Sequence, residues 1–184
     1  TRFFLTAGAV FDRIVATVYD VTGLRLPYDP HQIVSVKGAG SRLNLSSVQT
    51  LKTGYIYDWG SNIFEAVDGG VLDFSGLTLV ENYGRGDYPT YLNTLNSGNI
   101  LLSTLHTINS IYQQGLTVIN PSQSSYDLPA LTDVSFLQLQ PQHSISCPTL
   151  TQWIGGSATL NPGTEFHAPN LVSFKNATLN LVGS

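Results

Sequence analysis

Aromatic side chains gather beside carboxylates in three polar stretches of the chain, and these residue types could bind a ligand. The stretches are residues 52–62 (KTGYIYDWGSN), 81–91 (ENYGRGDYPTY) and 109–115 (NSIYQQG), which hold seven of the 19 aromatic residues. A Tyr or Trp ring can stack on a sugar ring while a neighbouring carboxylate bonds its hydroxyls, and the same mixture suits a protein partner. We expect either a ligand-binding edge or aromatic rings that fold back onto the protein and only pack.

The candidate ligand-binding residues come from the first two stretches; they are Tyr55, Tyr57, Asp58, Trp59, Glu81, Tyr83, Arg85, Asp87, Tyr88 and Tyr91. The enzyme alternative, a polysaccharide lyase or glycosidase, needs paired carboxylates at a defined separation or a calcium-binding acidic cluster beside an Arg or Lys base. Its candidates are Asp58, Glu81, Asp87 and Arg85, with Asp73 on the outer face of its strand. Because the three acidic loop residues show no repeat and no ligand spacing, we assign no catalytic residue.

Metal and cofactor sites are not expected. The four histidines, His31, His106, His143 and His167, lack the paired short spacing of zinc ligands. The stretch GAGSRL lacks both the glycine pattern and the Lys of a phosphate-binding loop. Cys147 is the only cysteine, and its apolar setting is typical of a small core residue.

The composition limits the class of protein. Only 11% of the residues are charged and the net charge is -4, which has the wrong sign for a nucleic-acid binder. No run approaches the 18 apolar residues of a membrane-spanning helix. The 17 Gly and nine Pro, with many Asn, Ser and Thr, are turn and strand formers, while good helix formers other than Leu are scarce. We therefore expect an all-β chain.

A nine-residue pattern recurs six times along the chain. It reads apolar, any, apolar, Ser or Pro, any, Leu or Val, any, any, apolar. The six units are LNLSSVQTL from Leu43, LDFSGLTLV from Leu72, ILLSTLHTI from Ile100, YDLPALTDV from Tyr126, ISCPTLTQW from Ile145 and FHAPNLVSF from Phe166. The alternating apolar positions that open each unit are typical of one face of a strand, and the Ser or Pro then turns the chain.

These units predict a single-domain, right-handed parallel β-helix, a form of β-solenoid, with irregular coils of about 19 to 29 residues. Residues 1–36, where VFDRIVATV matches only partly, are expected to form an irregular first coil or an N-terminal cap, and residues 37–184 the repeats. A leucine-rich repeat would need a recurring helical segment and Asn. A β-sandwich would not repeat the same nine residues.

The coils would place the aromatic stretches together. The unit is constant while the spacing between units falls from 29 to 19 residues, so the extra residues lie between units, mainly just after each one. Insertions of this kind map to loops on one side of a stack. The Thr residues at unit positions 7 and 8 also suggest an ice-binding ladder, but Gln49, Leu79 and His106 interrupt its columns.

Stretches such as VKGAGSRLNLSSVQTL, FEAVDGGVLDFSGLT and SSYDLPALTDV resemble the repeat units of β-solenoid regions in very large secreted or cell-surface bacterial proteins, planctomycete proteins among them. The resemblance covers about residues 33–184 and implies an extracellular or cell-surface stalk or adhesion module, without catalytic residues. We therefore expect a non-enzymatic module that presents its aromatic edge to a polysaccharide or a cell-surface protein. The chain is expected to continue in a longer protein or to self-associate end to end.

Overall fold

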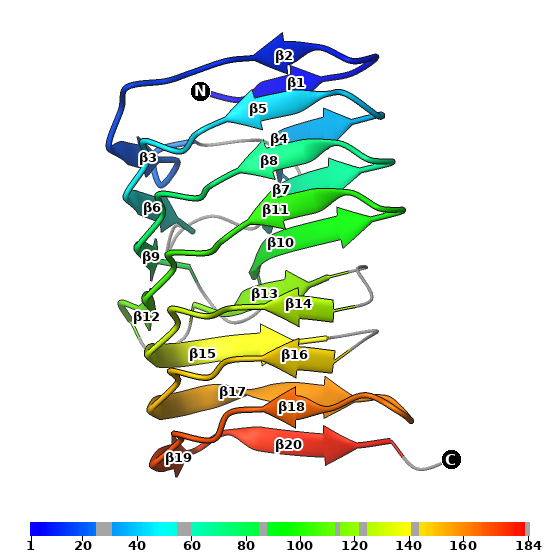
Figure 1. Ribbon diagram of the computed structural model, residues 1–184. Helices are drawn as coiled ribbons and strands as arrows, with labels where there is room; N and C mark the ends of the chain where they lie inside the picture. Colours follow the sequence, from blue (N-terminus) through cyan, green and yellow to red (C-terminus); the bar gives the residue numbers. More distant parts are fainter. Residues whose placement is uncertain are drawn as a thin grey trace.

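The computed structural model describes residues 1–24, 31–54, 60–84, 88–112, 115–121, 125–140 and 144–182. These residues form short β-strands and no helix, and each pair of neighbouring strands described among them is parallel. The strands stack in layers, with the N-terminus at one end and the C-terminus at the other (Figure 1). This all-β arrangement is consistent with the predicted β-solenoid.

The strands lie on three faces of the stack, which we call faces 1, 2 and 3 (Figure 1). Face 1 contains β1 (Phe3–Leu5), β4 (His31–Lys37), β7 (Asn62–Val67), β10 (Thr90–Leu95), β13 (Thr117–Asn120) and β20 (Thr178–Leu181). Face 2 contains β2 (Val10–Phe11), β5 (Arg42–Asn44), β8 (Val71–Asp73), β11 (Asn99–Leu101), β14 (Ser125–Asp127), β16 (Ser144–Ser146) and β18 (Phe166–His167). Face 3 contains β3 (Val18–Asp20), β6 (Thr50–Thr53), β9 (Leu79–Asn82), β12 (Thr107–Ser110) and β19 (Ser173–Lys175).

Two longer strands, β15 (Asp133–Leu139) and β17 (Gln152–Leu160), run from face 3 round a corner onto face 1. The beginning of β15 pairs with β12 and its end pairs with β13. This pairing joins faces 1 and 3 into one curled sheet of 13 described strands.

The nine-residue unit repeats in register across the stack. On face 2 the described strands form two sheets, one of β2, β5, β8 and β11 and one of β14, β16 and β18, and within each sheet the first positions of successive units pair, as Leu43 does with Leu72 and Leu72 with Ile100. Its ninth position forms a continuous column of Leu51, Val80, Ile108, Val134, Trp153 and Phe174. The unit read from the sequence is therefore also the unit of strand pairing.

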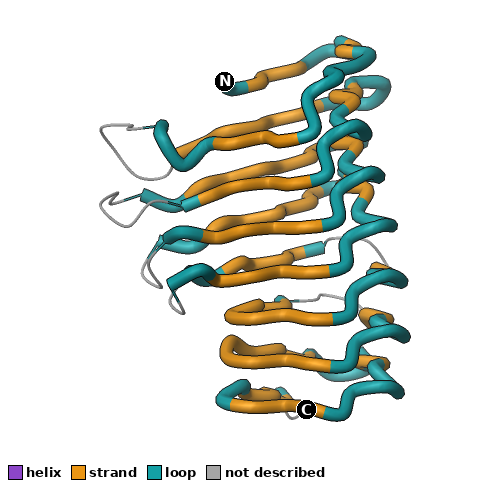
Figure 2. The backbone as a smooth tube through the Cα atoms, turned by 90° about the vertical axis from the view of Figure 1, so that its left-hand side faces the viewer, coloured by secondary structure: helices purple, strands orange, loops and turns teal. Residues whose placement is uncertain are grey.

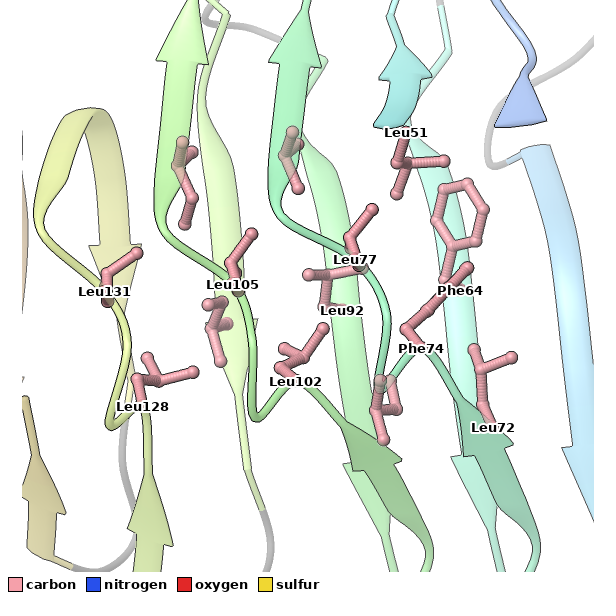
Figure 3. Packing of buried hydrophobic residues seen from close by; sticks show 14 of the residues in the cluster. Leu51, Phe64, Leu72, Phe74, Leu77, Leu92, Leu102, Leu105, Leu128 and Leu131 are labelled. Atoms are coloured by element: carbon pink, nitrogen blue, oxygen red, sulfur yellow. The ribbon is translucent and has the colours of Figure 1, made fainter. Parts of the chain in front are cut away.

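The apolar positions of the unit fill the interior. Position 3 is occupied by Phe74, Leu102 and Leu128 in three successive units, and position 6 by Leu77, Leu105 and Leu131 (Figure 3). All six side chains are buried. Burial of each contributes about 1.5–3 kcal/mol relative to an exposed side chain.

Positions 3 to 6 form a β-turn in all six units. In the unit from Leu72, the amide of Leu77 donates to Phe74 O at 2.9 Å. The Ser or Pro at position 4 is the second residue of this turn, where the restricted φ of Pro is favoured. Position 5 ties the turn to the preceding coil, since Thr104 Oγ1 donates to Ser75 O at 2.7 Å.

The hydrogen bonds of position 7 explain why Thr recurs at that position of the unit. Its carbonyl accepts two amides of the next unit, as Gln49 O does from Thr78 and Leu79. The Thr78 hydroxyl donates to the same carbonyl at 3.1 Å, and the hydroxyls of Thr132 and Thr151 make the equivalent bonds. These hydroxyls are engaged in stacking the coils, which accounts for them without an ice-binding surface.

The first coil differs from the predicted register by one residue. Phe11 pairs with Leu43, so the first unit is FDRIVATVY rather than VFDRIVATV. Arg13 and Ala16 then stand at positions 3 and 6, where later units carry apolar residues. A cavity of about 380 Å³ lies in this end of the stack, beside Ala16 and Val48.

Candidate functional site

The corner between faces 3 and 1 is shared by the connections in which the aromatic stretches lie, and we call it the loop edge. Residues 21–30, 54–61, 83–89 and 111–116 separate the strands at this corner in the first four coils, so the connection shortens from ten residues to six. In the next two coils β15 and β17 turn the corner within the strand, at Phe136 and at Gly155 (Figure 2). The described ends of the aromatic stretches therefore lie along one edge of the stack.

The structure describes part of the predicted ligand-binding set. Glu81 lies in β9 and Tyr83 follows it directly, while Tyr88 precedes β10 and Tyr91 lies within β10. The remaining candidates, Tyr55, Tyr57, Asp58, Trp59, Arg85 and Asp87, lie outside the described residues. Glu81 and Tyr83 are brought together on face 3, whereas Tyr91 lies round the corner on face 1.

Asn82 anchors the connections on either side of it. It is 1% exposed, its Nδ2 donates to Leu116 O at 3.0 Å, and its Oδ1 accepts from the amide of Gly84 at 2.8 Å. Leu116 belongs to the connection of the next coil, so one side chain holds the backbone of two neighbouring connections. Backbone groups that no strand pairs need such partners when they are buried.

Asn82 belongs to a set of buried polar side chains that lie in two neighbouring columns under the loop edge. We call this set the polar ladder. Its members are Thr53, Asn82 and Ser110 on face 3 and Asn62, Thr90 and Thr117 on face 1. The hydroxyls of Thr53 and Thr90 lie 2.6 Å apart and share a hydrogen bond across the corner. This ladder was not predicted, although the Thr, Asn and Ser that follow position 9 by two residues in three successive units are a sequence signal for its face 3 members.

The outer side of the same strands carries a hydrogen-bonded group of charged and aromatic residues. Lys52 Nζ lies 3.4 Å from Glu81 Oε2, and Tyr83 OH donates to the same oxygen at 3.2 Å. The Tyr83 ring packs edge-on against the ring of Tyr112 from the next coil, with centroids 6.2 Å apart. Tyr112 remains 52% exposed, so it offers ring surface to a ligand.

Glu81 sets the electrostatics of this group. The hydrogen bond to Glu81 and the negative charge of Glu81 raise the pKa of Lys52. Burial, followed by the hydrogen bond to Glu81, raises the pKa of Tyr83. Both groups therefore stay protonated near neutral pH, where they can donate hydrogen bonds but cannot act as bases.

Asp73, a candidate for the enzyme alternative, lies elsewhere and supports a turn. On face 2 its Oδ2 is 2.5 Å from Arg42 Nη2, and its Oδ1 accepts from the amide of Ser75 at 3.0 Å. Asp73 alternates with the core residues Leu72 and Phe74, as expected for the outer face of its strand, but it is only 4% exposed in this pairing. Burial alone would raise the pKa of this carboxyl, but the hydrogen bonds from Ser75 and Arg42 outweigh burial and lower the pKa.

Cys147 lies in the core, as its sequence setting predicted. Burial, reinforced by the charge of Asp127, raises the pKa of its thiol to about 12. Because the thiolate is the reactive form of cysteine, Cys147 is not a nucleophile near neutral pH.

Within the described ranges, no group of three or more His, Cys, Asp or Glu side chains could hold a metal ion. The part of the chain that the structure describes also contains no helix suited to crossing a membrane. Comparison of the chain with models of protein families, with curated proteins and with solved structures found no match.

Replacing Asn82 by Ala tests whether the polar ladder holds the loop edge. We expect the free energy of unfolding to fall by about 2–4 kcal/mol, because the buried Leu116 carbonyl and Gly84 amide both lose their partner. Urea unfolding measures this loss, and hydrogen exchange at the Gly84 amide should become faster. The control is Asn93→Ala, since Asn93 Oδ1 has no hydrogen-bond partner among the described residues. Equal losses in the two variants would contradict an anchoring role for Asn82.

Replacing Asp73 by Asn tests the role of its charge. The amide can still cap the turn, as Asn44 Oδ1 does for the Ser46 amide at 3.1 Å in the preceding coil, so mainly the ion pair with Arg42 is lost. We expect the variant to be about 1–2 kcal/mol less stable at pH 7. The folded-state pKa is lowered, so this stabilisation is complete above the unfolded pKa of about 3.9 and disappears as the pH falls through the folded value. Urea unfolding midpoints between pH 2 and pH 7 measure the difference in stability between the wild type and the variant. A difference that does not change with pH would contradict this account.

Proposed function

We propose that the chain is a non-enzymatic, extracellular or cell-surface module that acts as a stiff rod and presents the loop edge to a glycan or a protein. The observation that carries the proposal is the polar ladder, because it holds the described backbone on either side of the corner, at Gly84, Gly115 and Leu116. Asn82, Thr53 and Thr90 are buried in this role although apolar side chains fill the interior elsewhere. Described strand ends that are held in this way need less ordering when a partner binds.

We take the rod to be a right-handed parallel β-helix with coils of about 19 to 29 residues, part of an adhesin, stalk or surface layer. Crossover connections between parallel strands are right-handed in about 98% of cases, which supports this handedness. The resemblance of the repeat to β-solenoid regions of bacterial surface proteins supports the location.

The group at the loop edge supports recognition rather than cleavage. Tyr112 exposes half of its surface, and Tyr83, Lys52 and Glu81 supply hydrogen-bonding groups beside it. A polysaccharide lyase or glycosidase would need a second carboxylate or a base at a defined separation. Among the described residues, Glu81 is already engaged by Lys52 and Tyr83, and Asp73 lies on another face. Asp20, beyond Lys52 in the same column, accepts hydrogen bonds from the amide and the hydroxyl of Thr22.

A binding assay on immobilised glycans and cell surfaces tests this function. The intact chain is compared with a variant in which Tyr57, Trp59, Tyr83 and Tyr88 are changed to Ala, and with the control Phe4→Ala. Phe4 is 54% exposed in β1, away from the connections that carry the four changed residues.

We expect the intact chain and the control to bind and the edge variant to lose binding, with all three showing the same circular dichroism. Binding that survives in the edge variant would contradict the proposal. Release of shorter saccharides from a bound polysaccharide would show instead that the chain is an enzyme.

A further inference from the structure

Phe136 occupies a position where the backbone favours glycine. It turns β15 from face 3 onto face 1 with a φ of 53°, and Gly155 turns β17 at the same place in the next coil with a φ of 68°. A bulky residue in this left-handed region is an outlier, whereas glycine adopts it without steric cost. Strained residues of this kind gather at functional sites, so the aromatic ring needs an explanation beyond the turn.

The ring of Phe136 lies against the bare backbone of Gly155. A Cβ at Gly155 would lie 3.2 Å from three ring carbons of Phe136, so the absence of a side chain there makes room for the ring. Phe136 is half-buried, which leaves the rest of its surface open to solvent. The pair thus holds an aromatic ring in a defined orientation at the corner.

Phe136 continues the aromatic residues of the loop edge. Tyr83, Tyr112 and Phe136 follow β9, β12 and the first part of β15, which are paired neighbours on face 3. The Ser110 amide donates to Ser135 Oγ at 2.7 Å, so the last two of these strand ends are joined directly. The three aromatic residues therefore lie in three successive coils at the loop edge, with Tyr83 and Tyr112 in ring contact and Phe136 at the level of Ser110 in the next strand.

The charges beside this row set the kind of ligand it can take. Glu81, Asn109 and Ser135 form the outward column next to the aromatic residues. Lys52 is paired with Glu81, and Asp20 extends the same column beyond Lys52. No unpaired cation therefore stands in this column from Asp20 to Ser135 among the described residues, and the chain as a whole carries a net charge of -4. This part of the column therefore offers no unpaired positive charge with which to hold a polyanion.

We infer that the row of Tyr83, Tyr112 and Phe136 binds a neutral polysaccharide chain lying along the rod axis. The aromatic rings stack against successive sugar rings, while Glu81, Asn109 and Ser135 bond the sugar hydroxyls. This inference rests on the proposed function and narrows its ligand to one class.

The test measures binding of the full chain to immobilised polysaccharides of two classes. One class is neutral, a series of hexose and N-acetylhexosamine homopolymers, and the other is acidic, a polyuronate and a sulfated polysaccharide. The variants are Phe136→Gly and Tyr112→Ala, with Phe4→Ala as the control on an exposed aromatic residue elsewhere. Glycine suits the φ of position 136, so Phe136→Gly should retain the fold and a melting temperature close to that of the wild type.

We expect at least one neutral polymer to bind, and both edge variants to weaken that binding by about tenfold or more while Phe4→Ala leaves it unchanged. Neutral binding that Phe136→Gly leaves intact, or binding confined to the acidic polymers, would overturn the inference and leave the proposed function standing. Cell-surface binding that persists after enzymatic removal of glycans would also overturn the inference alone. If no polysaccharide and no cell surface binds, both the inference and the proposed function fail.

Discussion

The structure depends on one constraint, which is that each coil must place its apolar positions on the same positions of the next coil. A single nine-residue unit is too short to bury Leu72, Phe74 and Leu77 by itself, and only its neighbours complete the interior (Figure 3). The pairing of Leu51, Val80 and Ile108 shows how strictly the register is kept. A shift of one residue would turn every apolar side chain of a strand towards solvent.

This constraint leaves one part of each coil free to vary. The β-turn at positions 3 to 6 is tied to the preceding coil, as the bond between Thr104 Oγ1 and Ser75 O shows, so insertions there would break the stack. The corner between faces 3 and 1 has no such repeat, and its connection ranges from ten residues to the single residue Phe136. Its backbone groups still need partners, which Asn82 and the rest of the polar ladder supply. The edge at which the length of the connection varies is therefore also the edge at which the polar ladder holds the backbone.

The sequence predicted the features that follow from strand alternation and turn chemistry. Positions 1, 3, 6 and 9 are apolar for a single reason, burial, so their recurrence gave the unit and its register. The polar ladder was missed because alternation predicts an apolar side chain at Asn82, and only contacts across the corner show why an amide is needed. Phe136 was missed because a strained φ leaves no mark in a sequence. The burial of Asp73 was not predicted, because its ion-pair partner Arg42 belongs to another coil.

The central claim is the register of the unit, and an engineered disulfide tests it most directly. Thr107 and Asp133 are paired on face 3, so the variant with Cys at both positions should form a disulfide on mild oxidation. The control places Cys at Thr107 and Ser135, two residues out of register, where the Cα atoms should lie beyond about 7 Å and no disulfide should form. Cys147 is buried and should not compete. A disulfide in the first variant alone, seen by peptide mass, is the predicted result, whereas a disulfide in the control or in neither variant would contradict the account.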